Sequence, residues 1–203
     1  MQKNFDDKAL EANSDIELFH NFGVSLDTRT IYFGSLEYKH DSSDENGIDW
    51  KVAERTIKNL HILSKISKEK INIIMHSSGG DLSASFAIYD MMKMIPNKII
   101  VTAFGSCMSG ATIVMQGASQ RQMTKSTRMM IHDGYTSFEG KDNDFETYGK
   151  ESKALKDMMH ELYLSRMNPE KKMTKKLLDD KLKHDWYLSA KEALDYGFID
   201  KII

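Results

Sequence analysis

The chain has 203 residues, of which 40% are hydrophobic and 29% are charged, so we expect a single soluble, globular domain over residues 1–203. The formal net charge of −2 argues against a nucleic-acid partner, and the absence of an apolar run long enough to cross a bilayer argues against a membrane location. The single cysteine, Cys107, excludes an internal disulfide, and the polar start of the chain does not resemble a signal peptide, so we expect a cytoplasmic protein.

The predicted elements alternate between strands and helices along the chain. Residues 1–20 are polar and mixed, and we expect them to form a flexible N-terminal arm. Beyond it, β-branched and apolar runs predict strands at 28–33, 71–75, 99–104 and 128–132, and an aromatic and apolar run stands at 186–188. Apolar spacing and capping residues predict helices at 50–66, 81–94, 146–167 and 190–196, a buried helix beginning near 111 and a charged helix ending near 182. This alternation is typical of an α/β domain.

The segment after the third predicted strand carries the clearest chemical signal. There, Gly105-Ser106-Cys107-Met108-Ser109-Gly110 predicts a tight turn between the strand and a buried helix. The N–H groups at the start of a helix have no intrahelical acceptor, so they can stabilise negative charge beside a serine. Acyl-transfer enzymes place a nucleophile at such a junction. Small residues at a strand–helix turn also serve simple packing, and both interpretations of Ser109 are open at this point.

Three further features fit the same chemistry. Gly79-Gly80 follows the second strand, where glycines let the backbone approach a ligand and donate an N–H. His132 closes a strand and is a candidate general base, and Asp185 enters an apolar segment, where a carboxylate needs a partner such as histidine. Each has an ordinary alternative, as a plain turn, a structural histidine or a helix-end aspartate. The sequence has no paired cysteines and no His-Glu-x-x-His, so we expect no metal and no cofactor.

In their order and spacing, these motifs resemble the ClpP family, the proteolytic subunits of Clp proteases. The resemblance extends from about Ile31 to the C-terminus. The matching pieces are Ser78-Gly79-Gly80, Ala87-Ile88-Tyr89-Asp90, Gly105 with Ser109, Arg128-Met129-Met130-Ile131-His132, Asp185-Trp186-Tyr187-Leu188-Ser189-Ala190, Glu192-Ala193 and Tyr196-Gly197.

The resemblance implies a catalytic triad in which Ser109 attacks the peptide carbonyl, His132 transfers the proton and Asp185 orients the histidine. It implies an oxyanion hole made by the N–H groups of Gly80 and Gly110. The implied fold is a ClpP/crotonase-like spiral of βαβ units with a protruding strand–helix handle over about 133–167. Family members usually form homo-oligomeric heptamer rings stacked into a tetradecamer, whose chamber receives polypeptide substrates from an AAA+ unfoldase.

The chain departs from the family pattern at several positions. Ser78 replaces the proline of the usual Ser-Pro-Gly-Gly, and Gly110 replaces the methionine that usually follows the nucleophile. Lys183-His184 stands where the family commonly has an acidic–basic pair. Asn72 and Gln122 occupy positions where the family tends to place aromatic residues that grip the unfoldase. We therefore expect a divergent serine endopeptidase whose contact with a standard unfoldase is lost or altered.

Three other functions remain as alternatives on the sequence alone. A virus-type head-maturation protease of the same fold would share the chemistry and differ in substrate. A non-catalytic ring subunit would keep the fold and assembly without turnover. A crotonase-like acyl-CoA enzyme would also use paired N–H donors, but with Glu or Asp as acid and base, and the in-order serine, histidine and aspartate argue against it.

Overall fold

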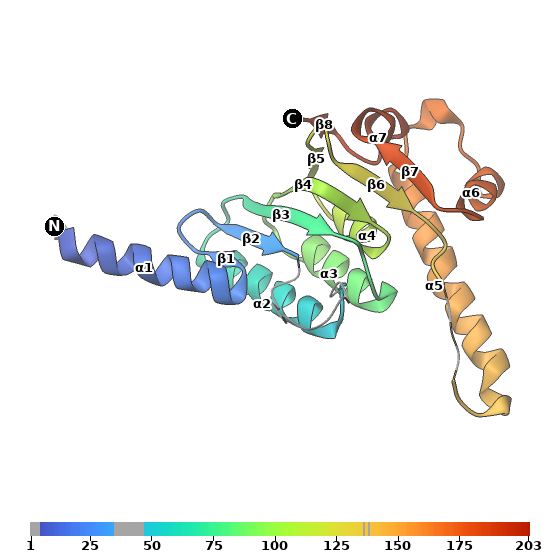
Figure 1. Ribbon diagram of the computed structural model, residues 1–203, viewed down its shortest axis with the longest axis horizontal. Helices are drawn as coiled ribbons and strands as arrows, with labels where there is room; N and C mark the ends of the chain where they lie inside the picture. Colours follow the sequence, from blue (N-terminus) through green and yellow to red (C-terminus); the bar gives the residue numbers. More distant parts are fainter. Residues whose placement is uncertain (1–4, 35–46, 136, 138) are drawn as a thin grey trace.

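The computed structural model describes residues 5–34, 47–135, 137 and 139–203 (Figure 1). The described chain alternates strands and helices, as the sequence predicts. The helices are α1 (Phe5–Phe22), α2 (Trp50–Ile66), α3 (Leu82–Met94), α4 (Gly110–Gln116), α5 (Phe145–Arg166), α6 (Lys175–Leu182) and α7 (Ala190–Tyr196), with 3₁₀ turns η1 (Asp142–Asp144) and η2 (Pro169–Lys171). The strands are β1 (Val24–Ser25), β2 (Thr30–Phe33), β3 (Ile71–Ser77), β4 (Ile99–Met108), β5 (Gln120–Met123), β6 (Arg128–Ile131), β7 (Trp186–Ser189) and β8 (Lys201–Ile202).

The strands form one sheet, in which β2, β3, β4, β5 and β8 are successive parallel neighbours. β1 pairs antiparallel with β2 at one edge. Ile71, Ile73 and Met75 of β3 are buried, because alternate residues of a strand point to the same face. The helices α2, α3 and α4 lie side by side on one side of the sheet (Figure 1) and complete the hydrophobic core there.

The strand β4 is longer than predicted and changes neighbours along its length. Its residues 100–103 pair with β5, whereas residues 106–108 pair in parallel with β6. The predicted end of this strand at Phe104, with a tight turn after it, is therefore wrong. Pairing with β6 extends the strand, and that pairing leaves no local pattern in the sequence. As a result, β4 ends immediately before Ser109 and beside the end of β6.

The N-terminal arm expected over residues 1–20 is helical in its described part, since α1 begins at Phe5. The carboxylate of Asp15 joins this helix to the next turn, because it accepts hydrogen bonds of 2.7 Å from Ser25 Oγ and from the Leu26 N–H. The bond from Ser25 is the main cause that lowers the pKa of Asp15. Apolar residues recur at three- and four-residue spacing at positions 5, 9, 12, 16 and 19, a helical signal that sequence analysis missed among the polar residues, and the contacts of Asp15 come from later in the chain.

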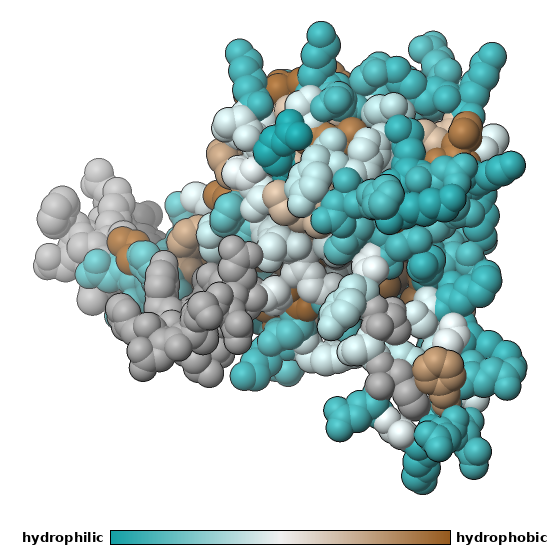
Figure 2. All heavy atoms as spheres, turned by 45° about the vertical axis from the view of Figure 1, so that its right-hand side comes forward, coloured by the Kyte–Doolittle hydropathy of each residue, from teal (hydrophilic) through white to brown (hydrophobic). Residues whose placement is uncertain are grey.

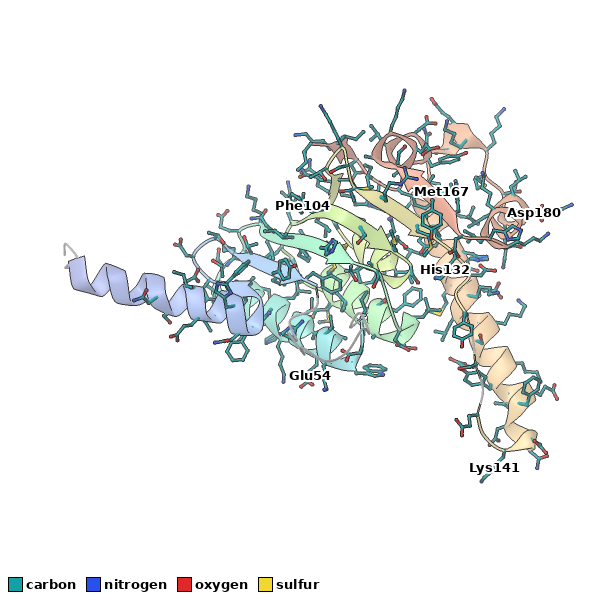
Figure 3. All side chains as sticks on the ribbon, viewed as in Figure 1. Glu54, Phe104, His132, Lys141, Met167 and Asp180 are labelled. Carbon is teal, nitrogen blue, oxygen red and sulfur yellow. The ribbon has the colours of Figure 1, made fainter. Side chains whose placement is uncertain are left out.

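Of the handle expected over 133–167, the described residues contain the helix. The helix α5 projects away from the sheet (Figure 1), and Lys141 lies near its far end (Figure 3). The strand expected before it is absent from the described residues between β6 and η1. A strand requires hydrogen bonds to a neighbouring strand, and the described part of the chain brings none alongside this segment.

The C-terminal part of the chain returns to the sheet. β7 pairs antiparallel with β6, and β8 pairs in parallel with β5. The caps of α7 are as predicted, because the Ser189 side chain accepts a hydrogen bond from the Glu192 N–H and Gly197 ends the helix at φ 82°. The strands β1, β5, β7 and β8 were not predicted, because they are short and are defined by the strands beside them.

Candidate active site

Ser109 stands between β4 and α4, at the junction that the sequence singles out. Its backbone has φ 50° and ψ −127°, an unusual conformation for a residue with a side chain. The Ser109 N–H donates a 2.8 Å hydrogen bond to the Met130 carbonyl of β6. The Ser109 carbonyl accepts a 2.9 Å bond from the Thr112 N–H in the first turn of α4. These contacts fix the peptide groups on both sides of the serine.

His132 follows β6 directly and faces Ser109. Because β4 and β6 are parallel, with Met108 opposite Met130, the residues that follow the two strands emerge at the same edge of the sheet. The His132 Nε2 atom lies 2.8 Å from Ser109 Oγ, within hydrogen-bond distance. Figure 3 places His132 where the sheet meets α5. The two residues that the sequence predicts as nucleophile and base are thus in contact.

Asp185 reaches His132 from the other side. It immediately precedes β7, and antiparallel pairing of β7 with β6 puts Trp186 opposite Ile131, so Asp185 lies next to His132. The Asp185 Oδ1 atom lies 3.1 Å from His132 Nδ1. The side chains of His132 and Asp185 are 26% and 49% exposed, so water reaches this end of the hydrogen-bonded chain.

The paired glycines of the β3–α3 turn pack directly against the serine. A Cβ atom on Gly79, whose φ is +99°, would lie 2.5 Å from the Met108 carbonyl and 2.6 Å from Ser109 Cβ. A Cβ atom on Gly110 would overlap Ser85 Oγ and would lie 3.4 Å from Gly80 N. The backbones of Gly80 and Gly110, predicted as oxyanion donors, are therefore adjacent.

Gly80, Ser109 and His132 line an open cleft of about 470 Å³. Its walls come from the start of α3, the segment after His132 and the first half of α5. Polar groups such as Ser109 and apolar ones such as Leu82 and Leu155 both line it. Hydrophilic side chains cover most of the molecular face shown in Figure 2, the side on which α5 and α6 lie. The cleft is thus open to solvent and has room for a ligand beside Ser109.

Sequence analysis missed two buried polar pairs that support this site from α5. Tyr163 Oη lies 2.6 Å from Thr112 Oγ1, directly beneath Ser109. His160 is only 2% exposed, and its Nε2 atom lies 2.6 Å from Asp133 Oδ1, one residue after His132. In the sequence, the available signal was that His160 and Tyr163 stand among the apolar residues of this helix. Their partners could not be inferred without the fold.

The second nitrogen of His160 faces α6. His160 Nδ1 lies 2.8 Å from Asp179 Oδ1, but this contact does not meet hydrogen-bond geometry. Lys156 Nζ lies 3.0 Å from the other oxygen of Asp133. The segment after His132 is thereby tied to α5, and α5 is tied to α6, which leads to Asp185.

The electrostatic setting distinguishes Ser109 from its neighbour Cys107. Cys107 is fully buried, and burial raises the pKa of its thiol to about 12. A protonated, inaccessible thiol is a poor nucleophile.

Across the described ranges, no group of three or more His, Cys, Asp or Glu side chains is arranged to hold a metal ion. No described helix is both long enough and apolar enough to span a bilayer.

Comparison with known proteins gives a consistent result. The Clp protease family model matches residues 42–203. The ATP-dependent Clp protease proteolytic subunit of Deinococcus radiodurans is 31% identical over 160 residues, which cover 77% of this chain and 76% of that protein. Proteolytic subunit 2 of Treponema denticola is 26% identical over 200 residues, which cover 97% of this chain and 91% of that protein.

Solved structures agree with the sequence matches. The structure of a ClpP1 mutant from Listeria monocytogenes superposes with a TM-score of 0.73 at 26% sequence identity. The match covers 88% of this chain and 92% of that one. The ClpP/crotonase-like fold class expected from the sequence is therefore confirmed.

Proposed function

Because the chain belongs to the Clp protease family, we propose that it is a serine endopeptidase that cleaves polypeptides inside an oligomeric chamber. The observation that carries the serine mechanism is the hydrogen-bonded chain from Ser109 through His132 to Asp185. This arrangement is that of a nucleophile, a general base and a group that orients the base.

In the proposed acylation step, Ser109 Oγ forms a bond to the carbonyl carbon of the substrate while His132 Nε2 accepts its proton across 2.8 Å. Asp185 accepts a hydrogen bond from the Nδ1–H, which keeps the lone pair of Nε2 directed at Ser109 and stabilises the imidazolium. The peptide C–N bond then breaks as His132 gives the proton to the leaving amine. Water attacks the acyl-serine with His132 again as base, which releases the acid and restores Ser109.

The carbonyl oxygen gains negative charge in both steps, and we assign its stabilisation to the N–H groups of Gly80 and Gly110. Gly110 begins α4, where the first N–H groups have no intrahelical acceptor. Gly80 lies against it from the β3–α3 turn. Preorganised N–H donors of this kind contribute about 3–4 kcal/mol each to transition-state stabilisation.

The assembly that we propose is a homo-oligomeric ring, a heptamer that stacks into a tetradecamer, with an AAA+ unfoldase as partner. The support is the family and the name of the relatives, which are subunits of ATP-dependent Clp proteases. Asn72 and Gln122 stand where the family tends to have aromatic residues, so we propose that the unfoldase contact is altered. Native mass spectrometry measures the ring size, and capture of a standard unfoldase with ordinary affinity would contradict the altered contact.

The proposed chemistry is tested by peptide hydrolysis with two serine variants. Ser109→Ala removes the nucleophile and should abolish turnover of a fluorogenic peptide without changing assembly. Ser106→Ala removes a serine of the same strand whose hydroxyl faces His76 instead, 3.4 Å from its Nδ1, and should leave turnover near the wild-type rate. Full activity in Ser109→Ala would contradict the assignment. A crotonase-like acyl-CoA enzyme would instead hydrolyse or isomerise acyl thioesters and leave peptides intact.

A further inference from the structure

Two buried hydroxyl groups lie directly beneath the proposed nucleophile. Thr112, in the first turn of α4, and Tyr163, on α5, are both fully buried. Their oxygen atoms, Thr112 Oγ1 and Tyr163 Oη, are 2.6 Å apart. Thr112 Oγ1 is also 2.6 Å from the carbonyl oxygen of Ser109. The three groups form a continuous chain from the projecting helix to the nucleophile.

The direction of these hydrogen bonds follows from the number of protons. A carbonyl oxygen can only accept, so the single proton of Thr112 Oγ1 is donated to Ser109. Thr112 Oγ1 must then accept the proton of Tyr163 Oη. Burial raises the pKa of Tyr163, so its hydroxyl remains a donor. The chain therefore runs from Tyr163 to Thr112 to the Ser109 carbonyl.

This chain of hydrogen bonds ends on Ser109, whose backbone conformation is unfavourable for a residue with a side chain. Ser109 has a φ of 50°, and residues held in such sparsely populated regions persist only where their surroundings over-determine them. Its N–H is held by β6, whereas its carbonyl accepts both the N–H and the hydroxyl of Thr112. Holding the peptide groups on both sides of Ser109 fixes its Cα–Cβ bond, from which Oγ reaches His132.

We propose that Tyr163 and Thr112 are positioning residues that hold the Ser109 backbone in the conformation in which its hydroxyl meets His132. This inference rests on the proposed function, in which Ser109 is the nucleophile. The Tyr163 ring is itself fixed by an edge-to-face contact with Phe198, with ring centroids 5.6 Å apart. The alignment of the nucleophile is thus linked to the position of α5.

Three single variants separate the hydroxyl groups from the packing around them. Thr112→Val keeps the shape and removes the Oγ1 atom, and kcat should fall by about tenfold or more while KM stays within about twofold. Thr112→Ser restores the hydroxyl and should recover most of the rate. Tyr163→Phe removes only the outer donor and should reduce kcat less than Thr112→Val. The rate of fluorophosphonate labelling of Ser109 should follow kcat, because it reports the nucleophile without a peptide substrate.

The double variant Thr112→Val/Tyr163→Phe distinguishes positioning from stability. Thr112→Val leaves the buried Tyr163 hydroxyl without its acceptor, which destabilises the fold, whereas removing both hydroxyl groups relieves that penalty. Positioning predicts that the double variant regains thermal stability but not kcat. Recovery of kcat together with the melting temperature would overturn the inference and leave the pair with a purely structural role.

The same experiment separates this inference from the proposed function. Wild-type protein that labels at Ser109 and cleaves peptides supports the proposed function on its own. If Thr112→Val then labels at the wild-type rate, the positioning role is wrong, and the proposed function still stands. An assembled wild type that neither labels nor cleaves would overturn the proposed function and this inference with it.

Discussion

The contact between His132 and Asp185 is the more exposed part of the Ser109–His132–Asp185 chain. It measures 3.1 Å, against 2.8 Å for the contact between His132 and Ser109, and the Asp185 side chain is 49% exposed. Tyr187 Oη lies 3.5 Å from the other carboxylate oxygen, at the limit of a hydrogen bond. Charge on Asp185, more than packing around it, must therefore orient the imidazole.

Replacing that charge should disable the base. Asp185→Asn can donate an amide N–H to Nδ1 and so favours the wrong tautomer of His132, in which Nε2 carries the proton. We expect kcat for peptide hydrolysis to fall by up to about 10⁴-fold with little change in melting temperature. Asp180→Asn, at an exposed position on α6 that pairs with Lys183, is the matched control and should be near wild type. A loss of less than tenfold in Asp185→Asn would show that Asp185 does not orient the base.

Cys107 provides an independent check on which side chain reacts. Burial raises the pKa of its thiol to about 12, and its Sγ atom lies 3.6 Å from Met75 Sδ in the core. Iodoacetamide at pH 8 should therefore leave the native protein unmodified, because thiolate is nearly absent and access is blocked. Protein unfolded in guanidinium is the control and should be alkylated fully at this single cysteine. Rapid alkylation of the native protein would contradict the burial.

Among the secondary-structure elements, the site depends on β6, which pairs with both β4 and β7. Its pairing partners bring Ser109 and Asp185 to opposite sides of His132. The sequence predicted these three residues and most of the helices, because strands, caps and motifs leave local patterns. It did not predict the extension of β4, the strand β5 or the contacts of Tyr163 and His160, because those features exist only through residues distant in the chain. The handle strand was expected by resemblance and is not found in the described residues.

The β3–α3 turn makes a testable contribution through Gly79. An added Cβ would press on the Met108 carbonyl and on Ser109, and φ is +99° there, so Gly79→Ala should displace the turn from the serine. We expect a loss of about 1–3 kcal/mol in the free energy of unfolding and of about 100-fold in kcat/KM. Gly149→Ala on α5, where nothing lies within 4 Å, is the matched control and should retain activity. Wild-type activity in Gly79→Ala would contradict close packing of this turn on the nucleophile.

At the scale of the whole molecule, Arg121 on β5 and Asp200 just before β8 form a contact that joins these two neighbouring strands. Arg121 is almost fully buried, and its guanidinium donates to both oxygens of Asp200, over 3.1 Å from Nε and 2.5 Å from Nη2. Burial acts to raise the pKa of Asp200, but the hydrogen bonds from Arg121 outweigh it and lower that pKa below the ordinary value of 3.8. A lowered pKa means that this carboxylate stabilises the fold above pH 3.8 and loses that effect as pH falls through its folded value.

Asp200→Asn should therefore destabilise the protein at neutral pH, by about 2 kcal/mol in the free energy of unfolding, because Arg121 keeps its charge without its partner. Urea melts at pH 7 measure this loss, with the exposed Asp180→Asn as control. Thermal melts should show the difference between wild type and Asp200→Asn narrowing as pH falls below about 3.8. A difference that is unchanged across this range would contradict the pairing.

The most direct test of the central claim is to treat the purified, assembled protein with a fluorophosphonate and to locate the adduct by mass spectrometry. The account predicts a single adduct on Ser109, absent from Ser109→Ala and strongly slowed in His132→Ala, since the base must activate the hydroxyl. Folded, oligomeric protein that forms no adduct, or that is modified at another serine, would contradict the claim that Ser109 is an aligned nucleophile.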